Sequence, residues 1–154
     1  MEEFSMPFLF VLLFAGAILL FSSVRVVREF ERGIVYTFGK YTGHREPGIR
    51  LVLPAIQQMF LIDMRLRTVD IPPQDVISKD NISVKVNAVV NYRILNPAYA
   101  INRVEDFMFT TSQLAQTSLR SIVGKHELDE ILSKRDELSR DIQEVLDAQT
   151  EGWG

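Results

Sequence analysis

The feature that most constrains the sequence is an apolar run near its N-terminus. From Phe8 to Val24 there is no charged residue, and Phe4 and Met6 extend the run towards the roughly 20 residues that cross a bilayer core. Only Ser22 and Ser23 interrupt it, whereas a helix on a soluble core normally keeps a polar stripe. We therefore predict a membrane anchor over residues 1–24. The predicted membrane-contacting residues are Phe8, Leu9, Phe10, Val11, Leu12, Leu13, Phe14, Ala15, Gly16, Ala17, Ile18, Leu19, Leu20 and Phe21.

The residues that flank this run predict its fate and orientation. A cleaved signal peptide would begin with basic residues, but Glu2 and Glu3 make this N-terminus acidic, so the anchor is expected to stay attached. On the other side stand Arg25, Arg28 and Arg32. By the positive-inside rule the remainder of the chain should face the cytoplasm.

The same arginines are expected to contact anionic lipid headgroups, at roughly 1 kcal/mol each. The competing topology is a shallow hairpin that returns to the same face of the membrane. A hairpin usually needs a breaker near its middle, but Pro7 lies at the start of the run and Gly16 is a weak breaker. We predict a single pass.

Composition removes several classes of function. The chain has no cysteine, which excludes disulfides, cysteine-based zinc or redox chemistry, and a palmitoyl anchor. Its net charge is -3, and no basic patch with interleaved aromatic residues follows the juxtamembrane arginines. We therefore expect no nucleic-acid partner.

After the anchor, a β-rich half precedes a helical half. Short strands are expected in "GIVYTFG" and in two segments of "REPGIRLVLPAIQQMFLIDMRL". From Ile82 to Ile94 apolar and polar residues alternate, which predicts a strand with one packed and one solvated face. Asp80-Asn81 predicts the turn of a hairpin before this strand, and Pro72-Pro73 restricts the preceding strand to an edge or bend.

Helical spacing then dominates to the end of the sequence. Apolar residues recur from Phe107 to Val123, and Gly124 suits the end of that helix. Ser133, followed by Asp136 and Glu137, predicts the N-cap of a last helix. The expected fold class is α+β, an antiparallel sheet covered by helices and preceded by the anchor.

A search for catalytic and metal-binding patterns finds little. His126 with Glu130 is a single i, i+4 pair, better explained by a solvated helix face than by a metal site. Ser121, His126 and Asp129 are nominally a nucleophile set, but they lie in one helical stretch without a nucleophile turn or an oxyanion hole. There is no phosphate-binding glycine loop. We predict no catalytic, cofactor or metal site, and no enzyme.

Four segments carry a family resemblance: "VREFERGIVYTFGKYTG", "PGIRLVLP", "IDMRLRTVDIPPQDVISKDNISVKVNAVVNYRILNP" and "TSQLAQTSLRSIVGKHELDEILSKRDEL". They resemble the SPFH (band 7) domain of the stomatin/slipin branch, prokaryotic type, over residues 25–154. The resemblance implies a non-enzymatic scaffold that oligomerises and organises membrane microdomains and partner membrane proteins. A regulatory adaptor of an NfeD-type protein or membrane serine protease is the alternative.

The sequence differs from the pattern of that branch in two ways. Related stomatins often use a proline-bent hairpin and palmitoylated cysteines, but here Pro7 stands at the edge of the run and cysteine is absent. The family pattern also continues past "EGWG" with a strand and a long coiled-coil helix that drives assembly. We therefore expect weakened oligomerisation from a sequence that ends at Gly154.

Overall fold

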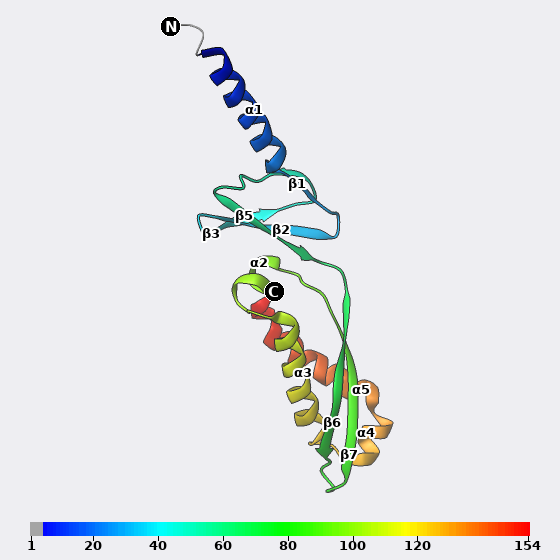
Figure 1. Ribbon diagram of the computed structural model, residues 1–154. Helices are drawn as coiled ribbons and strands as arrows, with labels where there is room; N and C mark the ends of the chain where they lie inside the picture. Colours follow the sequence, from blue (N-terminus) through cyan, green and yellow to red (C-terminus); the bar gives the residue numbers. More distant parts are fainter. Residues whose placement is uncertain (1–4) are drawn as a thin grey trace. The chain divides into compact units, whose positions relative to one another are not determined.

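The computed structural model describes residues 5–154, which divide into two compact units, residues 5–64 and 65–154. Glu2, Glu3 and Phe4, on which part of the anchor prediction rests, lie outside the described residues. Figure 1 shows the helices and strands of both units. The α+β prediction is confirmed. The strands, however, form three small antiparallel sheets in place of one, with the orders β1-β4, β3-β2-β5 and β6-β7.

The first unit combines one helix with five short strands. Its elements are α1 (Ser5–Ser23), β1 (Val24–Val27), β2 (Glu31–Thr37), β3 (Lys40–Arg45), β4 (Gly48–Leu51) and β5 (Gln57–Asp63). The sequence patterns predicted β2, β4 and β5, but not β1 or β3. The most deeply buried side chains are Val27, Ile34 and Val35, so the core of this unit lies on β1 and β2. Phe38 and Gly39 both have positive φ, which closes the tight β2–β3 hairpin.

The second unit is built on a long hairpin, β6 (Arg67–Ile77) and β7 (Ser83–Tyr92). The predicted alternation on β7 is confirmed, since Val84, Val86, Ala88 and Val90 are half-buried and the residues between them are exposed. The β6 register shifts between Ile71 and Gln74, where the two prolines cannot donate backbone hydrogen bonds.

Helices cover one face of this hairpin. They are α2 (Pro97–Asn102), α3 (Phe107–Val123), α4 (Leu128–Ser133) and α5 (Arg135–Thr150), followed by the 3₁₀ turn Glu151–Trp153. α3 contacts both β6 and α5 (Figure 1). Two adjoining apolar clusters join the helices to the hairpin, one around Leu119 and Val76, the other around Ala115 and Ile71.

The predicted N-cap at Ser133 is wrong. Ser133 is the last residue of α4, and its hydroxyl donates to the backbone carbonyl of Asp129 at 2.5 Å. Lys134 takes the N-cap position of α5 and makes no side-chain capping bond. The acidic first turn, Asp136 and Glu137, is present as predicted and favours this helix end electrostatically.

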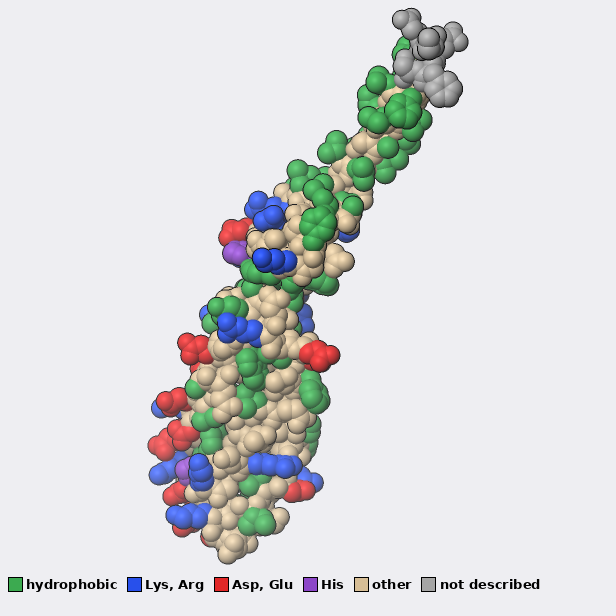
Figure 2. Space-filling model, turned by 90° about the vertical axis from the view of Figure 1, so that its left-hand side faces the viewer, with side chains coloured by type: hydrophobic (Ala, Val, Ile, Leu, Met, Phe, Trp, Pro, Cys, Tyr) green, Lys and Arg blue, Asp and Glu red, His purple; other side chains and the backbone are tan. Residues whose placement is uncertain are grey.

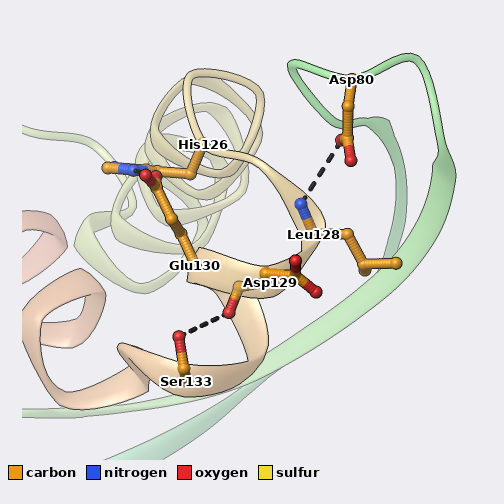
Figure 3. Close-up of polar contacts among 6 residues, drawn as sticks. All are labelled: Asp80, His126, Leu128, Asp129, Glu130 and Ser133. Atoms are coloured by element: carbon orange, nitrogen blue, oxygen red, sulfur yellow. Dashed lines mark hydrogen bonds and ion pairs between the residues drawn. The ribbon is translucent and has the colours of Figure 1, made fainter.

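The hairpin tip is fastened to the α3–α4 connection by polar contacts (Figure 3). The Asp80 carboxylate accepts the Ser78 hydroxyl and the backbone N–H of Leu128, at the start of α4. The Lys79 N–H donates to the carbonyl of His126 at 3.0 Å. Asn81 has a φ of 62°, as the predicted turn requires.

These contacts predict a pH-dependent stability. The Ser78 hydroxyl, more than any other group, holds the pKa of Asp80 below its ordinary value of 3.8. A lowered folded pKa means that the stabilisation is present above the ordinary pKa and is lost as the pH falls through the lowered one. We expect Asp80→Asn to lower the thermal midpoint slightly at pH 7, and the difference from wild type to vanish in acid. A difference independent of pH would show that the charge of Asp80 does not contribute.

Candidate membrane-binding site

The α1 helix has the length and composition of a membrane span. Residues Met6–Ser23 pass that test, and α1 is the only helix among residues 5–154 that does. Nineteen residues in α1 correspond to about 28 Å, close to the thickness of a hydrocarbon core. Apolar side chains cover the visible face of the helix (Figure 2), and almost none of it is buried inside the protein. The helix is unbroken at Gly16, where the hairpin topology would require a bend.

The chain passes directly from α1 into the β1–β4 ribbon. The backbone carbonyl of Ser23 accepts the N–H of Val52 at 2.8 Å, which ties the end of α1 to the residue that follows β4. The Ser23 side chain is buried and donates to the carbonyl of Leu19. Ser23 is therefore hydrogen-bonded both to the preceding turn of α1 and to the backbone that follows β4.

One face of the ribbon is apolar and exposed. Val24 lies opposite Leu51, and Val26 lies opposite Ile49, so these four side chains share a face. Val26 is 63% exposed and Ile49 is 74% exposed. Exposed apolar patches of this kind mark interaction surfaces for protein or membrane. Sequence reasoning missed this surface, because it needs the pairing of strands that lie more than twenty residues apart.

The three predicted headgroup residues differ in their surroundings. Arg25 and Arg28 are exposed, and the guanidinium of Arg28 lies 5.9 Å from the centre of the Phe30 ring. Arg32 is half-buried, and its Nη1 donates to the backbone carbonyls of Glu29 and Glu31. Arg32 is thus already held by the protein, while Arg25 and Arg28 are exposed.

Charge is distributed unevenly along the chain. Residues 25–64 contain six Arg and Lys against four Asp and Glu, whereas residues 65–154 contain eleven against fourteen. Basic side chains lie directly below the apolar helix (Figure 2). The excess of positive charge next to α1 suits contact with anionic lipid.

Comparison with known proteins identifies the domain after the helix. The family model for the SPFH domain / Band 7 family matches residues 25–154. The chain belongs to this family. An uncharacterized protein from Archaeoglobus fulgidus is 47% identical, with 93% of this chain and 57% of that protein covered. A stomatin homologue from Pyrococcus horikoshii is 39% identical, over 97% of this chain and 54% of the homologue. Stomatin-4 from Caenorhabditis elegans is 40% identical, over 94% and 52%.

This SPFH chain therefore spans about half the length of these relatives.

The nominal catalytic residues of the SPFH domain do not form a catalytic arrangement. Ser121 is an exposed residue of α3, and no hydrogen bond joins it to His126 in the described part of the chain. His126 Nδ1 lies 2.9 Å from Glu130 Oε2 (Figure 3), and this hydrogen bond is the main cause of a lowered pKa at Glu130. Asp129 instead accepts Ser133 through its backbone.

His126 and Glu130 thus form a partly exposed pair, as predicted, but the predicted helix face is wrong: His126 lies in the connection between α3 and α4, and only Glu130 is in a helix. A shallow depression of about 160 Å³ lies beside it, lined by His126, Glu130, Lys134, Glu137, Leu138 and Asp141. Among residues 5–154 no three His, Cys, Asp or Glu side chains gather closely enough to hold a metal ion. The depression is therefore lined mainly by polar side chains of both charges.

Proposed function

We propose that this SPFH chain is a non-enzymatic membrane scaffold, in which many anchored copies associate laterally and organise a patch of lipid and membrane proteins. The observation that carries the proposal is the direct junction of a charge-free, largely apolar helix with a stomatin-like domain. The exposed apolar face of the β1–β4 ribbon and the basic residues beside it supply further membrane contact.

Anchoring has a physical consequence for assembly. Copies held in one membrane meet at a much higher effective concentration than free copies, so weak lateral contacts are enough for association. A scaffold of this kind does not need a catalytic site. It needs a firm anchor and a domain with a surface for its neighbours.

We place the anchor in the prokaryotic plasma membrane as a single pass, with the SPFH domain on the cytoplasmic side. The support is the basic flank Arg25, Arg28 and Arg32 that follows α1. Protease added to sealed inside-out vesicles should then digest the domain, whereas protease added to intact spheroplasts should not. Digestion in spheroplasts would reverse the orientation.

Cross-linking in the native membrane tests the scaffold. A tagged chain should give a ladder of self-adducts at low expression level, and the ladder should disappear when the membrane is dissolved in excess detergent. A single dominant adduct with another membrane protein, such as an NfeD-type protein or a membrane serine protease, would instead make the chain an adaptor. Mass spectrometry of the adducts separates the two results.

The small residues of α1 give a prediction on how the anchors meet. A Cβ added at Gly16 would have no atom within 4 Å, so Gly16→Leu fits the helix itself. We expect insertion to be unchanged and cross-linked dimer between anchors to decrease, because small residues let two helices approach closely. Val11→Leu, which replaces one large apolar residue by another, is the control. Equal cross-linking in both variants would show that Ala15-Gly16-Ala17 has no role in assembly.

A further inference from the structure

The second face of the β1–β4 ribbon carries two arginines directly opposite each other. The register pairs Arg25 on β1 with Arg50 on β4. Like charges at opposed positions of an antiparallel pair destabilise it. The Arg50 Nε donates to the backbone carbonyl of Glu46 at 3.0 Å, which leaves its two Nη groups for another acceptor. In the described part of the chain no carboxylate forms an ion pair with Arg25 or Arg50.

The depth of this pair is set by the helix that precedes it. Arg25 is two residues after Ser23, the last residue of α1. If α1 fills the hydrocarbon core, Arg25 lies where the bilayer becomes polar. Strand pairing brings Arg50, which is distant in sequence, to the same level. The pairing thereby adds Arg50, which the sequence did not predict to contact the membrane, to Arg25, which it did.

The two faces of the ribbon have complementary chemistry for an interface. The face with Val26 and Ile49 is apolar and exposed. The opposite face carries the exposed Arg25 and the half-buried Arg50 next to Val27, which is buried in the core of the unit. A ribbon lying in the interface would place its apolar face towards the acyl chains and its guanidinium groups at the level of the phosphates. This is the arrangement by which amphipathic elements bind at a membrane surface.

We propose that Arg25 and Arg50 together bind the phosphate of an anionic phospholipid headgroup; the proposal rests on the membrane anchoring proposed above. Guanidinium groups bind phosphate oxygens through paired, charge-assisted hydrogen bonds. One phosphate between the two arginines would attract both guanidinium groups and offset the repulsion between them. Arg32 is a poorer candidate, because two backbone carbonyls already accept its Nη1.

A lipid is the favoured source of this phosphate over a free anion. A free phosphate would satisfy the arginines but leave the apolar face of the ribbon in water. A phospholipid offers a phosphate to one face and acyl chains to the other, within a few residues of the anchor. The bound group is therefore expected to be part of the membrane.

Lipid binding can be measured on the full chain in mild detergent by native mass spectrometry. We expect the first adduct with phosphatidylglycerol to form at a lower lipid concentration than the adduct with phosphatidylcholine. Arg25→Gln and Arg50→Gln should each weaken the phosphatidylglycerol adduct by about tenfold, the loss of one charge-assisted contact. Arg45→Gln, on β3, removes the same charge and should have little effect.

A folding defect and a binding defect are separable. Without anionic lipid, Arg50→Gln should keep or raise the thermal midpoint, because the repulsion with Arg25 disappears. Arg50→Lys keeps the charge but loses the planar fork, so its affinity should fall between those of wild type and Arg50→Gln. Wild-type affinity in Arg50→Lys, or equal losses in Arg45→Gln and Arg50→Gln, would overturn the site in favour of general charge attraction.

Two further measurements are needed. One distinguishes a lipid phosphate from free phosphate, and the other distinguishes the headgroup site from the scaffold proposal. Inorganic phosphate that competes fully with phosphatidylglycerol at equal concentration would show a free-anion site and overturn the lipid assignment. Carbonate extraction of the same variants reports on anchoring alone. A chain that stays in the membrane, but shows no difference between the arginine variants, would remove the headgroup site and leave the scaffold proposal standing.

Discussion

Two arginines placed within the anchor, Leu12→Arg with Phe14→Arg, are expected to remove the protein from the membrane. Both positions lie near the middle of the Met6–Ser23 span. They are about 200° apart around an α-helix, so no single neighbouring helix could shield both charges. An arginine at the centre of a span costs roughly 2.5–3.5 kcal/mol on insertion scales, and two should therefore shift insertion by several orders of magnitude. The fraction that resists carbonate extraction measures the effect.

The matched control adds the same two charges away from the helix. Phe109 on α3 and Leu132 on α4 are both 62% exposed, so Phe109→Arg with Leu132→Arg should stay membrane-bound. Loss of membrane binding in the control would point to misfolding. Retention of the anchor variant in the membrane would mean that α1 does not span it, and that the β1–β4 ribbon or a partner holds the protein there.

The anchor and the long hairpin were predictable because their signals are local. A charge-free run and a strict alternation can be read without knowing what lies across from them. β1 and β3 were missed for the opposite reason. β1 has only four residues and becomes a strand through its pairing with β4. β3, with the sequence KYTGHR, is polar and mostly exposed. Neither has an apolar period of its own.

The same distinction applies to the candidate site. Arg25 was predicted to meet headgroups because it follows the apolar run, but Arg50 lies in a different strand and joins Arg25 only through the register. The capping rule failed at Ser133 because two helices meet there. A serine between them can end the first helix as readily as it can begin the second, and its hydroxyl bonds back to Asp129.

The α1 helix and the β1–β4 ribbon would contribute differently to membrane binding. The helix supplies hydrophobic burial without direction, since apolar side chains surround it on all sides. The ribbon has distinct apolar and cationic faces, so its contact with lipid would be directional. The proposed scaffold would need both, because insertion would hold each copy in the membrane while an oriented domain would present the same surface to every neighbour.

Truncation of Leu119 should have the largest effect on the stability of the second unit. Leu119 on α3 is 6% exposed and belongs to the cluster with Val76 on β6, Ile131 on α4 and Leu138 on α5. Leu119→Ala leaves a cavity where four elements meet, which should cost about 3 kcal/mol of the free energy of unfolding. Domains are stable by only about 5–15 kcal/mol, so this is a large fraction of the total.

Trp153, the single tryptophan, follows α5 and reports on this unit by its fluorescence during urea unfolding. The midpoint should move to clearly lower urea in Leu119→Ala. Leu132→Ala removes the same atoms from a side chain that is 62% exposed, and it should change the free energy of unfolding by less than about 0.5 kcal/mol. Equal midpoints for the two variants would mean that α3 does not pack on β6, and the covered face of the hairpin would then need another partner.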